Sequence, residues 1–178
     1  MRPTIWLLSL FILLVVQAGV LMPLHLSPVN LVLIMAVVST LLAGFNLGLG
    51  LTIAGGLFLD FLSGTPDGLV TMTMVCVFLL LYFIVNSVLA RESSQIILFT
   101  SVAASTIVYF IIFLVMNRLF GIFRLSTALD YNYVFKVDLP LTLMFNLIFT
   151  YPVFKYYLFT EKLTKKFGKH SPRLNLYE

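Results

Sequence analysis

Long stretches without any charged residue are the feature of this sequence that most limits its fold. Lys, Arg, Asp and Glu are absent from residues 3–59, 68–90, 93–117 and 139–154. A helix needs about 20 apolar residues to cross the hydrocarbon core of a bilayer. Stretches of this number and length cannot be buried in the soluble core of a 178-residue chain, and they lack the alternation of a membrane barrel. They predict an all-α membrane protein.

We expect a six-helix transmembrane bundle over residues 1–160, followed by a basic cytoplasmic tail over residues 161–178. The predicted spans are 4–22, 29–43, 47–62, 69–89, 96–116 and 139–159. The second and third helices are short, because a helix rises about 1.5 Å per residue and these two fall below the ~30 Å core. They either cross a thinned bilayer or form a hairpin that does not cross completely.

The distribution of charge predicts the orientation. Lys and Arg exceed Asp and Glu by 11 to 7, a formal net charge of +4, and the excess lies in the tail. Because positive loops stay inside, we expect both termini in the cytoplasm of a multi-pass protein. A cleaved secretory signal over residues 1–18 is the competing interpretation. We prefer a retained helix, because the apolar run continues through Met22 and only Arg2 precedes it.

Composition excludes several classes of function. Hydrophobic residues make up 61% of the chain and charged residues 10%, whereas soluble domains contain about 25% charged residues. A soluble enzyme or a nucleic-acid-binding domain would need far more polar surface than this. The chain is therefore expected to act within or at the membrane.

Few residues offer recognisable chemistry. Cys76 is the single cysteine, which excludes an internal disulfide and a cysteine zinc cluster. His25 and His170 are predicted on opposite faces of the membrane, so they cannot cooperate as nucleophile and base. Asp60 and Asp67 could act as paired carboxylates only if the turn between them brings them together. We predict no catalytic, cofactor or metal site, although a site assembled from polar groups without a motif stays open.

Residues 44–68 contain a row of small or polar residues spaced four apart, which we call the small-residue stripe. Its members are Gly44, Gly48, Thr52, Gly56, Asp60 and Gly64. Residues at this spacing share one helical face, and small residues let helices approach closely in lipid. The stripe predicts either packing inside the bundle or a surface for a partner helix. Asp60, at the end of an apolar span, is either exposed or anchors a loop or a partner.

Other polar residues lie within the predicted spans. Gln17, Asn30, Asn86 and Asn146 are expected to form hydrogen bonds between helices inside the bundle. Residues 117–138 are expected to form a long outer loop, and Asp138 followed by Pro140 predicts the start of the last helix.

Residues 56–68 read Gly-Leu-x-x-Asp-x-x-Ser-Gly-x-x-x-Gly, residues 28–31 read Pro-Val-Asn-Leu, and Asn146 is followed by Pro152. These three segments resemble the MreD family of bacterial rod-shape-determining membrane proteins. Residues 56–68 resemble the end of the family's glycine-rich helix. Residues 27–34 resemble its Pro-(Asp/Asn)-Leu start of the second helix, with Val29 inserted. Residues 146–152 resemble its last helix, in which an Asn precedes a Pro near the cytoplasmic end. Size and helix number agree over essentially the whole chain.

The resemblance implies a non-enzymatic scaffold of the cell-elongation (rod) complex in the bacterial cytoplasmic membrane. Such a protein binds MreC and supports side-wall peptidoglycan synthesis and cell shape. The implied indirect partners are MreB, RodA and a class B penicillin-binding protein. The resemblance also implies contact with membrane lipids and no binding of nucleic acid. The stripe residues and Asn146 are the candidate residues for binding a partner or for helix packing.

A substrate-binding component of an energy-coupling-factor type vitamin transporter is the alternative, because the two families are similar in size, helix number and expected fold. Such components usually carry a small-x-x-x-small face on the first helix, whereas residues 6–14 here read Trp-Leu-Leu-Ser-Leu-Phe-Ile-Leu-Leu. They also bind ligand in an outward pocket lined with polar groups, of which the sequence suggests few. A membrane chaperone or another scaffold is a third interpretation.

Overall fold

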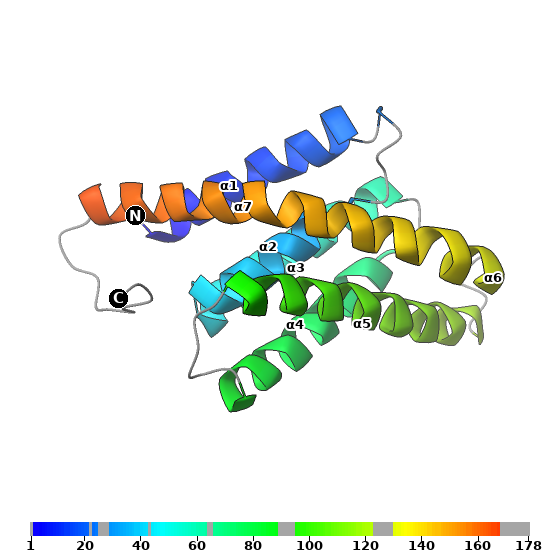
Figure 1. The fold of residues 1–178 in the computed structure, drawn as a ribbon. Coiled ribbons are helices and arrows are strands. Elements are labelled where there is room, and N and C mark those ends of the chain that lie inside the picture. Colours follow the sequence, from blue (N-terminus) through cyan, green and yellow to red (C-terminus); the bar gives the residue numbers. More distant parts are fainter. Residues whose placement is uncertain are drawn as a thin grey trace.

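The computed structural model describes residues 2–21, 23–24, 29–42, 44–63, 66–88, 95–122 and 130–167, and nearly all of these residues are helical (Figure 1). The elements in order are α1 (Arg2–Val16), η1 (Gln17–Leu21), α2 (Leu31–Leu42), α3 (Phe45–Ser63), α4 (Leu69–Val88), α5 (Gln95–Ile122), α6 (Tyr131–Tyr133), η2 (Val134–Asp138) and α7 (Leu139–Phe167). The two η elements are single π-helical segments. The prediction of an all-helical protein is confirmed for this part of the chain.

Four helical segments are long and apolar enough to cross a membrane. They are Thr4–Leu21, Phe45–Ser63, Gln95–Ile122 and Tyr131–Thr160. Leu31–Leu42 and Leu69–Val85 are shorter apolar helical stretches. The sequence predicted that the second and third helices would both be short, and this holds for α2. It is wrong for α3, whose 19 residues reach from Phe45 to Ser63, because the turn before it takes up fewer residues than expected.

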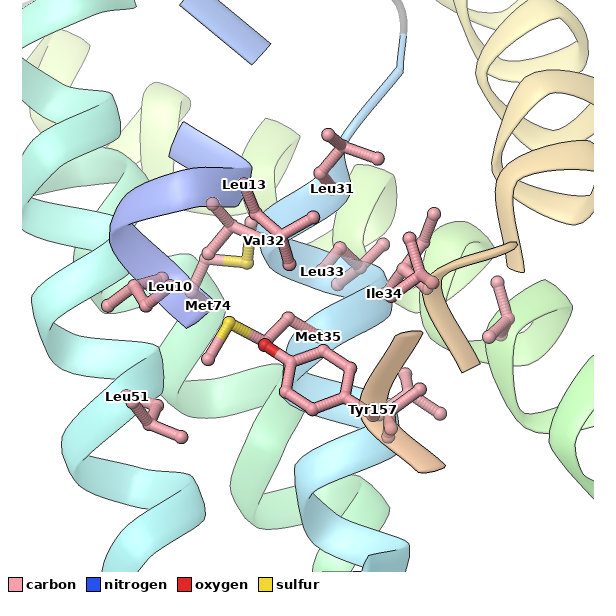
Figure 2. Packing of buried hydrophobic residues seen from close by; sticks show 14 of the residues in the cluster. Leu10, Leu13, Leu31, Val32, Leu33, Ile34, Met35, Leu51, Met74 and Tyr157 are labelled. Carbon is pink, nitrogen blue, oxygen red and sulfur yellow. The ribbon is translucent and has the colours of Figure 1, made fainter. Parts of the chain in front are cut away.

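The short helix α2 lies at the centre of the bundle. All but one of its 12 residues are buried, and it contacts α1, α3, α4, α5 and α7. Figure 2 shows part of this core, in which α2 meets Leu10 and Leu13 of α1, Leu51 of α3, Met74 of α4 and Tyr157 of α7. A helix surrounded by protein does not need to match the thickness of the lipid, so 12 residues, about 18 Å, are sufficient here.

The helices alternate in direction, so their ends gather at two ends of the bundle (Figure 1). At one of them, which we call the η1 end, η1 and α3 finish and α2, α4 and α7 begin. The opposite end contains the start of α1 and the last turns of α7. Trp6 and Tyr157 stack there with ring centroids 4.6 Å apart, and both are fully buried. This contact holds the first and last helices together.

The described residues of the expected long loop, 117–122 and 130–138, are almost all helical, and further helical turns precede the helix that was expected to begin at Asp138. Helix α5 continues to Ile122, and the last helical segment already begins after Asp130. The Asp130 side chain accepts hydrogen bonds from the backbone N–H groups of Asn132 and Tyr133, at 3.0 and 3.4 Å. An aspartate that accepts from these positions is a strong N-cap. Pro140 therefore lies inside the helix rather than at its start.

The π-helical segment η2 explains how the helix passes Pro140. The backbone N–H of Leu139 bonds to the carbonyl of Val134, five residues back, so the hydrogen-bonding register is shifted directly before the proline. A wider turn of this kind accommodates a residue that lacks a donor. Helix α7 then continues to Phe167, seven residues beyond the domain boundary expected at residue 160; residues 168–178 of the predicted tail lie outside the described part.

Candidate functional site

The small-residue stripe faces other helices of the same chain. A Cβ placed on Gly48 would lie 2.7 Å from the Phe78 ring of α4, and one on Gly56 would lie 2.8 Å from the Cα of Thr71. A Cβ placed on Gly55, which lies beside the stripe, would be 2.5 Å from Cγ1 of Val32 on α2. These glycines therefore allow α3 to pack closely against α4 and α2.

The remaining stripe residues have separate roles. Thr52 is buried, and its hydroxyl donates to the carbonyl of Gly48 in the preceding turn. Gly44 is exposed and has φ +86°, a conformation that favours glycine and that forms the turn before α3. Gly64 lies outside the described residues, and so does the side chain of Asn86.

Asp60 caps the start of α4 from the face of α3. Its carboxylate accepts hydrogen bonds from the backbone N–H groups of Val70 at 2.8 Å and Thr71 at 3.1 Å, and from the Thr71 hydroxyl at 2.5 Å. Only 5% of Asp60 is exposed. The first N–H groups of a helix have no partner within the helix, and a carboxylate at this end also interacts favourably with the helix dipole. Asp60 thus connects α3 to α4.

The start of α2 is held in the same way by three polar side chains. Asn146 of α7 accepts from the backbone N–H of Asn30 at 2.9 Å, and Gln17 of η1 accepts from that of Leu31 at 3.1 Å. The Asn30 side chain accepts from the N–H of Leu33 at 3.0 Å. The amide nitrogen of Asn146 also donates to the hydroxyl of Thr106 on α5, at 3.1 Å. Asn146 is fully buried, so it joins α2, α5 and α7 in the interior.

A cavity of about 310 Å³ lies at the η1 end, next to the start of α2. Polar side chains from four elements and from the residue before α2 line it, namely Gln17, Asn30, Ser63, Asp138 and Thr142. Its volume is at the lower end of the range typical of small-molecule sites, about 300–1,000 Å³. Apolar side chains such as Val29, Leu59 and Val70 complete the lining.

An aromatic wall from α5 forms another side of this cavity. It consists of Tyr109, Phe110 and Phe113. The Tyr109 ring stacks on that of Phe113 and meets that of Phe110 edge-on, in both cases with centroids 5.8 Å apart. The sequence analysis did not select these residues. Their grouping depends on which face of a uniformly apolar helix turns inward, and the apolar spacing of α5 gave no signal for it.

Among the described residues, no group of three or more His, Cys, Asp and Glu side chains could hold a metal ion. Asp60 is buried at the start of α4 while Asp67 is exposed. The polar side chains that the structure brings together are those at the starts of α2 and α4 and those around the cavity.

No family model, no curated protein and no solved structure matches this chain. The resemblance to MreD and the partners that it implies therefore stay predictions from the sequence motifs.

We expect Gly56→Ala to reduce stability, because the new methyl group would collide with the backbone of Thr71, which cannot rotate away. Overpacking of this kind costs about 1–3 kcal/mol. The control is Gly50→Ala, where no atom lies within 4 Å of the added carbon. Thermal unfolding in detergent measures both variants. Equal midpoints for the two variants would contradict the close contact between α3 and α4.

Replacing Asp60 with Ala should leave two backbone N–H groups of α4 without their acceptor. Loss of a cap and unsatisfied buried donors cost about 1–3 kcal/mol. Amide hydrogen exchange at Val70 and Thr71 should accelerate, whereas the exposed acid Asp67 can be changed to Ala without this effect. Unaltered exchange at both amides in Asp60→Ala would show that the carboxylate does not cap α4.

Asn146→Leu should destabilise the protein by about 1–3 kcal/mol, because the N–H of Asn30 loses a buried acceptor. Thr106→Val keeps the acceptor for the Asn30 N–H and removes only the hydroxyl that accepts from Asn146, so it should destabilise the protein less than Asn146→Leu. Hydrogen exchange at Asn30, together with the unfolding midpoint, separates the variants. If Asn146→Leu were as stable as the native protein, the hydrogen bond from the Asn30 N–H to Asn146 would not contribute to stability.

Proposed function

We propose that this protein is a non-enzymatic membrane scaffold of the MreD type, acting in the cell-elongation complex of a bacterial cytoplasmic membrane. In this role it binds MreC through the membrane region and, through MreC, works with MreB, RodA and a class B penicillin-binding protein in side-wall peptidoglycan synthesis. The proposed topology has six membrane helices with both termini in the cytoplasm, in a bundle similar to that of energy-coupling-factor substrate-binding components.

The observation that carries this proposal is that the residues of the resemblance form one structural unit. In the segment 56–68, Gly56 makes room for Thr71 and Asp60 caps α4. Gly68 has φ +88° directly before α4, a conformation that favours glycine. The first glycine, the aspartate and the last glycine of the motif thus each have a physical reason for their position, which supports a shared fold rather than chance similarity.

The geometry also limits where a partner can bind. Helix α4 covers Gly48, Gly56 and Asp60, so these residues can contact another protein only if α3 and α4 separate. Apolar side chains that face outward are available instead. Examples are Leu8 and Phe11 of α1, each 59% exposed. In a bilayer such side chains contact either lipid or the helix of a partner.

A vitamin-transporter component is the second candidate, and the cavity at the η1 end is the observation that favours it. The sequence suggested few polar groups for such a pocket, but Gln17, Asn30, Asp138 and Thr142 converge on one cavity of about 310 Å³. A saturable rise of the melting temperature with a single vitamin would support this second function.

Cysteine crosslinking in cells tests the scaffold function. In a Cys76→Ala background, a cysteine at Tyr133 is expected to capture MreC, because this side chain is 56% exposed near the η1 end, where the outer domain of MreC would approach. A cysteine at Phe83 of α4, which is 71% exposed near the opposite end, serves as the matched control. Capture of an ATPase-coupled transporter subunit instead of MreC would overturn the scaffold proposal.

A further inference from the structure

We propose that the cavity at the η1 end binds a cationic group, an ammonium or guanidinium on an apolar stem, through the carboxylate of Asp138. Asp138 lines the cavity, and no described residue donates a hydrogen bond to its carboxylate. It belongs to a segment long and apolar enough to cross a membrane, Tyr131–Thr160. Asp138 is half-buried. A carboxylate in such a segment is costly unless water or a partner compensates its charge, and it commonly marks a functional site.

Charged groups around the cavity favour a cation. The carboxylate of Asp60 lies next to the part of the lining that α4 forms, because it accepts a hydrogen bond from the N–H of the lining residue Val70 at 2.8 Å. The nearest cation in sequence, Lys136 of the same element, is exposed and does not line the cavity. Asp138 is the one charged residue among the described lining residues, which include no Lys or Arg, so the lining carries a negative charge.

The aromatic wall complements such a group. Tyr109, Phe110 and Phe113 present three neighbouring rings to the cavity. A cation over an aromatic face gains about 0.5–2 kcal/mol, with the larger values where water is excluded, and the rings also cover the apolar stem. Carboxylate and rings together select a charged head on a hydrophobic body over either part alone.

The backbone supports a binding role for this cavity. Gln17 and Asp138 belong to the two π-helical segments, η1 and η2, and both line the cavity. Turns of this type often occur at functional sites, where they redirect a side chain. The Gln17 oxygen accepts from Leu31, and its amide nitrogen, in a residue only 6% exposed, has no acceptor among the described residues.

Binding of 2-phenylethylammonium to the full-length protein in detergent tests the proposal, with 2-phenylethanol as the neutral compound of the same shape. We expect saturable calorimetric binding and an affinity about tenfold or more above that of the alcohol, as for a charge-assisted hydrogen bond. Asp138→Asn should abolish this preference, whereas Asp67→Asn, an exposed acid outside the lining, should keep it. Equal affinity for the two compounds, or no binding of the amine, overturns the proposal.

A second variant keeps the proposal testable if Asp138→Asn does not fold. Phe113→Leu leaves the carboxylate and removes one ring, so it should weaken the amine several-fold more than the alcohol. The emission of Trp6, the single tryptophan, which stacks on Tyr157, reports native packing in each variant. A natively packed Asp138→Asn protein that still prefers the amine overturns the proposal, and so does an unchanged preference in Phe113→Leu.

The cation could come from a free amine or from a basic side chain of a polypeptide. A blocked peptide, acetyl-Gly-Leu-Lys-Leu-Gly-amide, is therefore compared with the same peptide containing norleucine at the central position. Tighter binding of the lysine peptide than of 2-phenylethylammonium assigns the site to a protein side chain, and the reverse assigns it to a free amine. A norleucine peptide that binds as well as the lysine peptide, with no binding of the amine, contradicts a cation site.

Discussion

The need to satisfy backbone N–H groups at buried helix starts is the constraint on which this bundle depends. Inside a membrane protein no bulk water is present to replace a missing partner, and each unsatisfied group costs several kcal/mol. Helix α2 begins among other helices, and Asn30, Gln17 and Asn146 provide its acceptors. Helix α4 begins against α3, where Asp60 provides them. Four polar side chains of the apolar sequence, Gln17, Asn30, Asp60 and Asn146, thus stabilise helix starts.

These caps make the close packing of the bundle possible. Because the start of α2 is satisfied inside the protein, α2 can be only 12 residues long and still occupy the centre, in contact with five other helices. The glycines of α3 then let this helix approach Thr71 and Phe78 of α4 to van der Waals distance. The polar caps fix where helices begin, and the small residues fix how closely they approach.

The sequence predicted the helical class and most helix positions, because the runs without charge are much longer than the uncertainty in where each helix begins and ends. It also identified Gln17, Asn30, Asn146 and Asp60 as polar groups in apolar surroundings. It missed that they bond to backbone at helix starts, since the acceptor of a distant N–H depends on tertiary packing. Helix α7 begins at Leu139, next to the expected start, but the π-helical turn before it was not predicted, because it depends on hydrogen bonds that leave no pattern in the sequence. The cavity was not predicted because it combines residues from elements far apart in sequence.

The bond between Asn146 and Asn30 joins residues 116 positions apart, and this separation has a consequence for biogenesis. A ribosome delivers the chain from its amino end, so the second helix leaves the exit tunnel long before its acceptor on the last helix has been made. Until then its first amide must bond to water or to another temporary partner. The earlier helices can enter the bilayer in turn, but the interior locks only when synthesis of the final helix is well advanced.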